Sequence, residues 1–129
     1  MPYPADYKYT KEHEWLKIDG GTGVIGITDY AQNSLGDIVF VELPKVGSEI
    51  SAGKTFGSVE SVKAVSDLFA PVTGTVTEVN ESLNTAPEQV NKDANFTWMV
   101  KVKLKDPGEA SGLLSTADYE KFIAEEGGH

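Results

Sequence analysis

The 129-residue chain contains neither cysteine nor arginine. Without cysteine it can form no disulfide, no thiolate metal site and no cysteine nucleophile, so any thiol chemistry must come from a group added to the chain. Without arginine it has no planar guanidinium with which to clamp a phosphate or a carboxylate. Its net charge of −9 makes nucleic acid and anionic membranes poor partners.

Histidine and long apolar runs are also scarce. The two histidines, His13 and His129, lie at opposite ends of the chain, which leaves no pair with metal-ligand spacing and no Ser-His-Asp triad. No apolar run approaches the length of a membrane span. The N-terminal segment resembles neither a signal nor a transit sequence. We therefore expect a cytoplasmic protein, or a mitochondrial matrix protein if a transit peptide has been removed, with no membrane partner.

Short apolar stretches separated by glycine and proline fill most of the chain. Asp19-Gly20-Gly21 between two such stretches predicts a hairpin over 13–28, and the segment 28–36 predicts a short helix. Further strands are expected in 37–44, 55–62, 64–71, 74–80 and 97–105, and a closing helix in about 115–126. This pattern indicates one domain over 1–129, an all-β sandwich or barrel with a helical appendage.

Three finer expectations follow from the same pattern. The segment 45–54 reads as a turn-rich connection, and 83–91 as one helical turn with Pro87 near its start. In "TWMVKVKLK" the alternation places Trp98, Val100, Val102 and Leu104 on the core face. It places Met99 and the lysines on the other face.

Lys63 stands out because strand-like residues flank it on both sides in "GSVESVKAVSD". This leaves room only for a tight hairpin, over about 56–70, with the lysine near its tip. A lysine displayed in this way suits amide formation with a carboxylic-acid cofactor. The alternative is an ordinary solvated lysine, which is the usual role of a single lysine on a strand.

Two longer stretches carry a family resemblance. "GITDYAQNSLGDIVFVELPKVG" and "VESVKAVSDLFAPVTGTVTEVNESLN", with Gly47 and Gly74, resemble the H proteins of the glycine cleavage system. The resemblance extends from "YTKEHEW" to "MVKVKL" and the closing helix. Biotin carriers flank their lysine with methionines, whereas Val62 and Ala64 stand here. The resemblance implies a flattened β-sandwich, or barrel-sandwich hybrid of the lipoyl/biotinyl type, with short helices and a C-terminal helix.

The same resemblance implies a function. Lys63 would carry lipoate as an amide and would shuttle an aminomethyl group from a pyridoxal-phosphate-dependent glycine decarboxylase (P protein) to a tetrahydrofolate-dependent aminomethyltransferase (T protein). Dihydrolipoamide dehydrogenase (L protein) would reoxidise the arm, and a lipoate ligase or an octanoyl/lipoyl transferase would attach it. The chain itself would be a substrate of these enzymes and not an enzyme.

Three carboxylates accompany this hypothesis. An aminomethyl group carried on the arm needs a dry resting place, and its protonated amine favours a carboxylate neighbour. Glu14, beside Trp15, and Asp67, just past the hairpin tip, are the candidates for this shelter. Glu60, inside the attachment motif, is the candidate for recognition by the ligase. For each of them the alternative is a solvated surface carboxylate. His13 is expected to have a structural or surface role.

Several alternatives stay open. The segment "NKDANFTWMV" departs from H proteins, which usually have a Pro-Tyr and Gly-containing loop there, so the conformation of 92–98 is not predicted. A lipoyl-relay protein that donates lipoate to 2-oxoacid dehydrogenases would need the same Lys63 hairpin. An unmodified β-sandwich that mediates only protein contacts would not need it. A free-standing enzyme is the weakest option, since no nucleophile–base pair can be assembled.

Overall fold

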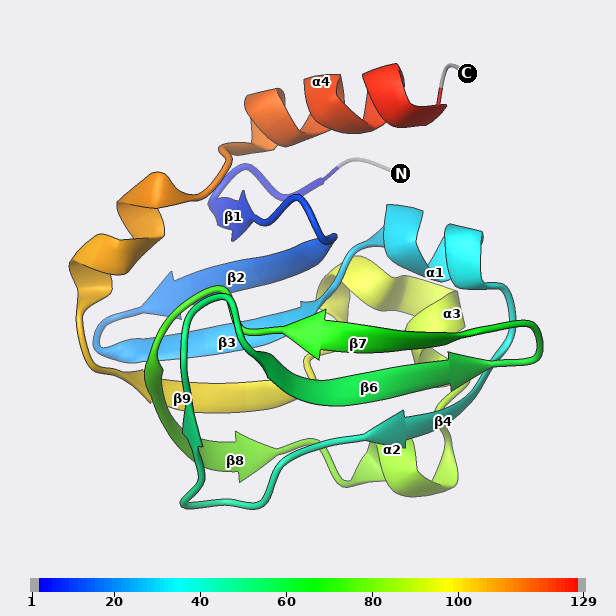
Figure 1. Ribbon diagram of the computed structural model, residues 1–129, viewed down its shortest axis with the longest axis horizontal. Helices are drawn as coiled ribbons and strands as arrows, with labels where there is room; N and C mark the ends of the chain where they lie inside the picture. Colours follow the sequence, from blue (N-terminus) through cyan, green and yellow to red (C-terminus); the bar gives the residue numbers. More distant parts are fainter. Residues whose placement is uncertain (1–2, 128–129) are drawn as a thin grey trace.

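The computed structural model describes residues 3–127 as two antiparallel β-sheets with short helices around them (Figure 1). The six-stranded sheet has the order β1-β2-β3-β9-β8-β5, and the three-stranded sheet has the order β4-β6-β7. The strands of the larger sheet are β1 (Tyr7–Tyr9), β2 (Glu14–Asp19), β3 (Thr22–Ile27), β9 (Val100–Leu104), β8 (Gly74–Val79) and β5 (Glu49–Ile50). Those of the smaller sheet are β4 (Ile38–Glu42), β6 (Thr55–Ser61) and β7 (Val65–Phe69).

The predicted hairpin and first helix are both confirmed. Asp19 pairs with Thr22 across the turn between β2 and β3, and Gly20 supplies the positive φ of 63° that the turn requires. Helix α1 (Asp29–Leu35) begins after Thr28, whose hydroxyl accepts a hydrogen bond from the Ala31 amide. It ends at Gly36, whose φ of 82° and ψ of −155° are open to glycine alone.

The other helices are α2 (Ser82–Thr85), α3 (Gln89–Asp93), α4 (Thr116–Gly127) and the 3₁₀ helices η1 (Ala94–Phe96) and η2 (Pro107–Gly112). The prediction of one helical turn over 83–91 was wrong, because the structure has two helices there. Proline disfavours a helical conformation in the residue before it. Ala86 accordingly has φ −137° and ψ 63°, so the helix breaks before Pro87 and a new one starts after it.

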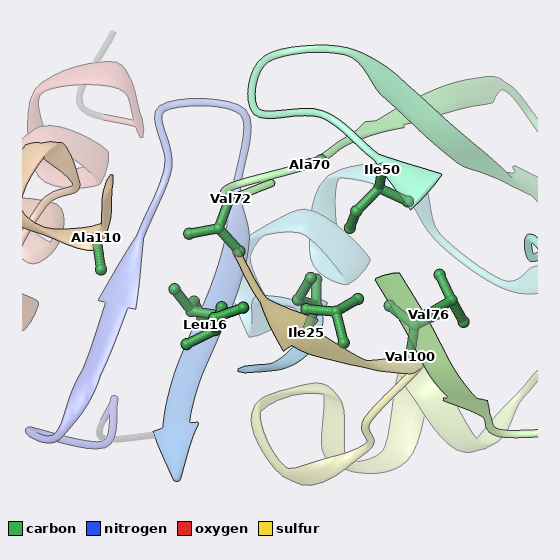
Figure 2. Packing of buried hydrophobic residues seen from close by; sticks show 10 residues of the cluster. Leu16, Ile25, Ile50, Ala70, Val72, Val76, Val100 and Ala110 are labelled. Carbon is green, nitrogen blue, oxygen red and sulfur yellow. The ribbon is translucent and has the colours of Figure 1, made fainter. Parts of the chain in front are cut away.

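The core lies between the two sheets and continues beneath the helices. One cluster joins the larger sheet to the segment that follows β7, and Figure 2 shows Leu16, Ile25 and Val100 facing Ile50 and Val72. A second cluster packs the smaller sheet against α2 and α3. Its members include Val41, Val59, Leu83 and Val90. A third, aromatic cluster holds α4 over β1 and β2. Its buried members are Tyr7, Tyr9, Trp15 and Tyr119.

Two details of the larger sheet correct the sequence analysis. Met99 is fully buried and its amide donates to the Ile25 carbonyl, so its predicted outward position was wrong. Strand β9 begins only at Val100, and the period-two alternation does not reach back to Met99. Trp98 is consequently half-buried, with the Lys101 Nζ 4.8 Å from its ring centroid. The segment read as a turn-rich connection contains β5.

The predicted mainly-β sandwich with short helices is confirmed, and the sheets remain open. Strands β1 and β5 are the edges of the larger sheet, and β4 and β7 are the edges of the smaller one, so no barrel closes. In Figure 1 the smaller sheet lies in front of the larger, and the β6–β7 hairpin reaches out at one side near α1. No helix within residues 3–127 is both long and apolar enough to cross a bilayer.

Candidate functional site at the tip of the β6–β7 hairpin

Lys63 lies at the tip of the β6–β7 hairpin, where the sequence places it. Strand β6 ends at Ser61 and β7 begins at Val65, so only Val62, Lys63 and Ala64 form the turn. All three are exposed, and Val62 retains 70% of its accessible surface. The Lys63 amine can therefore be approached by another protein without any change in the fold.

The turn is held by the side chain of Ser61, which is itself buried. Its hydroxyl accepts hydrogen bonds from the amides of Lys63 (3.3 Å) and Ala64 (3.1 Å) and donates to the Ala64 carbonyl (3.2 Å). The Ser61 amide also donates to the Ala64 carbonyl, at 2.8 Å. Serine bonding to the next few backbone groups is a local turn device. Here it fixes the backbone that presents Lys63.

The end of α1 supports the tip from the side. The Val62 amide donates to the Asp37 carbonyl at 3.0 Å, which ties the turn to the segment that follows α1. A Cβ at Gly36 would stand 3.6 Å from the Lys63 Cε, so the aliphatic part of the lysine rests beside this glycine. The short helix predicted from "TDYAQNSLG" thus ends at the stem of the candidate lysine.

Asn91, on α3, holds that supporting segment in place. Its side-chain amide donates to the Gly36 carbonyl and to the Gln32 Oε1, both at 2.9 Å. Its Oδ1 accepts from the Ile38 amide at 2.8 Å. Asn91 therefore forms hydrogen bonds with the residues on either side of Asp37. The Asp37 carbonyl is the group that accepts the hydrogen bond from the Val62 amide. Sequence reasoning missed both Asn91 and Ser61. Only the serine left a local signal, a hydroxyl two residues before the lysine.

Glu60, the candidate recognition residue, lies on β6 next to the buried Ser61. It is exposed, and it pairs with Phe40 of β4 on one side and with Val65 of β7 on the other. Its side chain accordingly belongs to the outer face of the smaller sheet. The structure therefore places Glu60 beside the tip, on a surface that another protein could contact.

Glu14, a candidate for the shelter, is 1% exposed at the start of β2. One carboxyl oxygen accepts from the Thr10 hydroxyl, and the other accepts from the Phe69 amide at 3.1 Å. Burial raises the pKa of Glu14 to about 7, although both hydrogen bonds act to lower it. Glu14 and Phe69 line a pocket of about 540 Å³, together with Ala70 and Pro71. That volume lies within the range of small-ligand sites.

Asp67, the other candidate, is exposed and lies opposite Ser58 on the outer face of the smaller sheet. It lines a separate pocket of about 330 Å³ with Glu42 and Phe56. The structure therefore does not bring Asp67 and Glu14 into one pocket. They are linked along β7, because Asp67 lies two residues before Phe69, whose amide bonds Glu14.

His13 lies outside this site and links α4 to α1. Its Nδ1 is 2.9 Å from the Tyr119 hydroxyl, which is 2.7 Å from the Thr28 hydroxyl that caps α1. The pKa of His13 is lowered because burial disfavours its charged form. Glu126, 3.6 Å from its Nε2, acts in the opposite direction but does not reverse this shift. Within residues 3–127 no group of three His, Asp or Glu side chains could hold a metal ion. His129 lies outside the described residues.

The segment 92–98, whose conformation the sequence leaves open, folds against β2 and α1. The Trp15 indole donates to the Ala94 carbonyl at 3.0 Å, and the Asn95 Oδ1 accepts from the Asp29 amide at 2.9 Å. The departure from the family pattern is thus accommodated on the side of α1 that faces the larger sheet.

An open β-sandwich with a lysine at the tip of its outer hairpin defines a protein of the lipoyl/biotinyl carrier class. The family model described as "Glycine cleavage H-protein" matches residues 7–126. The chain belongs to the glycine cleavage H-protein family.

Individual relatives agree with the family match over the whole chain. The glycine cleavage system H proteins of Koribacter versatilis and Acidobacterium capsulatum are 70% and 66% identical to this chain over 129 residues, with all of each chain covered. The crystal structure of a glycine cleavage system H protein from Mycobacterium marinum matches with a TM-score of 0.84 and 38% identity. That match covers 98% of this chain and 99% of the other.

Proposed function

We propose that this chain is a lipoyl carrier of the glycine cleavage system, with lipoate joined by an amide to the Nζ of Lys63. The observation that carries the proposal is the presentation of Lys63 on a three-residue turn that Ser61 and Asp37 hold from behind. Family membership supports the pathway. The chain then acts as a substrate of its partner enzymes and catalyses nothing alone.

Attachment requires only an accessible amine from this chain. The neutral Nζ of Lys63 attacks the carbonyl carbon of an activated acyl group, an acyl-adenylate from a ligase or a thioester from an octanoyl/lipoyl transferase. The new C–N bond forms as the bond to AMP or to the thiol breaks, and the nitrogen loses one proton. The exposed turn satisfies the need for access, and the hydrogen bonds behind it fix the backbone from which Lys63 projects.

Once attached, lipoate would supply the dithiol that takes the aminomethyl group from glycine decarboxylase to the aminomethyltransferase and is reoxidised by dihydrolipoamide dehydrogenase. These enzymes, together with the enzyme that attaches the arm, are the proposed partners. A chain without cysteine offers no competing thiol. The cytoplasm expected from the sequence stays a prediction.

Strand β7 offers a path from Lys63 to the shelter. Val65, Asp67 and Phe69 share one face of the strand, and Val65 to Phe69 spans roughly 13 Å. An extended lipoyl-lysine arm has a similar reach. An arm lying along β7 would pass Asp67 and end at the pocket where Glu14 meets the Phe69 amide. There a protonated amine would meet a carboxyl group whose ionisation it favours.

The shelter is tested by the lifetime of the loaded arm. We expect the aminomethyl group to be lost about tenfold faster from Glu14→Ala, and about threefold faster from the exposed Asp67→Asn, because each change removes an anionic neighbour of the amine. Release of ammonia or formaldehyde from purified loaded protein measures this rate. Decay at the wild-type rate in both variants would reduce the two residues to structural or solvated carboxylates.

The carrier function is tested by intact mass after co-expression with a lipoate ligase and lipoate. The wild type is expected to gain one lipoyl group, and Lys63→Arg to gain none, because the guanidinium of arginine keeps the positive charge but cannot be acylated. If the ligase modifies a control carrier but leaves the wild-type chain unmodified, the result would favour a β-sandwich that mediates only protein contacts. Failure of the lipoylated chain to accept labelled glycine carbon would favour a lipoyl relay.

A further inference from the structure

The outer face of the smaller sheet carries two rows of cross-strand neighbours. In the row nearest the hairpin tip, Phe40 of β4 lies opposite Glu60 of β6, and Glu60 lies opposite Val65 of β7. In the next row Glu42 lies opposite Ser58, and Ser58 opposite Asp67. These six residues form what we term the docking face. Phe40 and Val65 retain 52% and 67% of their accessible surface, so the first row presents two apolar side chains around a carboxylate.

A β-bulge is the reason that Phe40 faces outward. Ile38 pairs with Ser61 and Phe40 with Glu60, so β4 contains one residue more than β6 over this stretch. Ile38 and Val41 are buried, whereas Val39 and Phe40 between them are exposed. Regular alternation from the buried Ile38 would have turned Phe40 into the core. The extra residue instead turns the aromatic ring outward, into the row that contains Glu60.

We propose that the docking face is the surface to which the acylating enzyme binds when it modifies Lys63. This inference rests on the proposed lipoylation of Lys63 and adds the contact surface. The complementary partner surface would have apolar pockets that receive Phe40 and Val65. Between these pockets it would carry a basic side chain that pairs with Glu60.

Reach is the argument for the acylating enzyme over the enzymes that use the arm. Acylation occurs at the Nζ itself, which is no further from the backbone than one lysine side chain. An active site that reaches this atom must cover the residues next to the tip. Glu60 and Val65 are those neighbours, and Phe40 continues their row. Enzymes that act on the dithiol meet it at the end of a much longer arm, so they need not cover this row.

Charge gives the second argument. The docking face contains three carboxylates, those of Glu42, Glu60 and Asp67, and none of its six residues is cationic. An apolar pair set among carboxylates matches a partner surface that is apolar at its centre and basic at its rim. Such a pairing speeds association at low salt and is weakened as salt screens it.

The test compares Phe40→Ser with Phe96→Ser. Phe96 is 60% exposed and lies in η1, which is not one of the strands of the docking face, so it matches Phe40 in type and exposure. We expect Phe40→Ser to lower the kcat/KM of acylation of the unmodified chain by a purified lipoate ligase about tenfold, mainly through KM. Phe96→Ser should stay within about twofold of wild type, and both variants should keep the wild-type thermal midpoint.

Two further pairs extend the test. Val65→Ser is matched by Val46→Ser at a 59% exposed loop position, and only the former should slow acylation, by about fivefold. Glu60→Gln should slow it by about threefold at low salt and have less effect as salt rises. Phe40→Ser, Glu60→Gln and the two control variants are then lipoylated to completion with excess ligase and assayed with the decarboxylase and the dehydrogenase, where they should match wild type within about twofold.

The outcomes separate this inference from the function on which it rests. If the wild-type protein is never acylated, the proposed lipoyl carrier function is itself refuted. A wild type that is acylated, with Phe40→Ser no slower than Phe96→Ser, would overturn the docking face alone. Lipoylated Phe40→Ser that has lost as much activity with the later enzymes as with the ligase would reassign the face to those enzymes and would also overturn the proposal.

Discussion

The two ends of strand β7 differ in how far their polar groups are exposed to water. At the Val65 end the chain is exposed, and the turn is held by neutral hydrogen bonds that the Ser61 hydroxyl and the Asp37 carbonyl accept from backbone amides. At the Phe69 end the strand amide donates to Glu14, a carboxyl group almost fully removed from water. One end is thus built to be reached and the other to exclude water. The strand between them spans about the length of the proposed arm.

The largest expected effect concerns the buried end. Because folding raises the pKa of Glu14 from 4.5 to about 7, the folded state binds its proton more tightly than the unfolded state does. Stability should therefore fall as pH rises from 4.5 to about 7, by roughly 3 kcal/mol. Glu14→Gln removes the ionisable group, so its free energy of unfolding should lack this decline. Urea unfolding from pH 4.5 to 8 measures both slopes.

Two comparisons make this measurement specific to Glu14. Glu125→Gln changes an exposed carboxylate on α4 and should keep the wild-type slope. His13 acts in the opposite direction, because burial lowers its pKa and so favours folding as pH rises. His13 is present in both the wild type and Glu14→Gln, so its contribution cancels in the difference between their free energies of unfolding. Parallel curves for these two proteins would mean that Glu14 is not held protonated.

The next effect concerns the support behind the exposed end. Asn91→Ala removes two hydrogen bonds to the Gly36–Ile38 segment and a third to the Gln32 side chain, and it should cost about 2 kcal/mol of unfolding free energy. It should also slow acylation of Lys63 about fivefold in native protein, because the Asp37 carbonyl that receives the Val62 amide is no longer held. Acylation kinetics and thermal unfolding measure the two effects.

The control for Asn91 is Asn84→Ala, a change at an exposed asparagine of α2 whose side chain makes no hydrogen bond within residues 3–127. It should alter neither quantity by more than the error. An Asn91→Ala protein that is destabilised but acylated at the wild-type rate would show that Asn91 only stabilises the fold and does not position the tip.

The smallest effect concerns the turn itself. Ser61→Ala removes the hydroxyl that accepts from the Lys63 and Ala64 amides, and water can replace it at those exposed groups. We expect a loss of about 1 kcal/mol in unfolding free energy. Hydrogen exchange of the amides of residues 62–64 should speed up, and Ser61→Thr should restore part of the protection. Unchanged exchange in Ser61→Ala would mean that backbone pairing alone closes the turn.

The sequence predicts those parts of the fold and site that depend on neighbouring residues. Asp19-Gly20-Gly21 marks a hairpin, Thr28 and Gly36 mark the ends of α1, and strand residues on both sides of Lys63 leave room only for a tip. Each of these signals lies within a few residues of the structure it describes. The family resemblance extended the prediction to the sandwich, which the fold confirms.

What the sequence could not show depends on partners far along the chain. Asn91 acts on a segment more than fifty residues earlier, and Glu14 reaches the Phe69 amide 55 residues later. The exposure of Phe40 follows from a bulge, which is a property of how β4 registers with β6. Met99 was misassigned because the alternation was extended past the true start of β9. Composition within a window contains none of this information.

The support of the turn by Asp37 and Asn91 has a consequence for how an acceptor lysine is recognised. A peptide that copies residues 57–67 would keep Ser61 but would lose the carbonyl that receives the Val62 amide and the α1 end beside the lysine stem. If Lys63 is the acceptor, it is defined by a three-dimensional epitope assembled from three separate parts of the chain. The letters "ESVKA" in an unrelated or unfolded protein would then be a poor substrate, and surveys of acylation sites would do better to compare surfaces than strings.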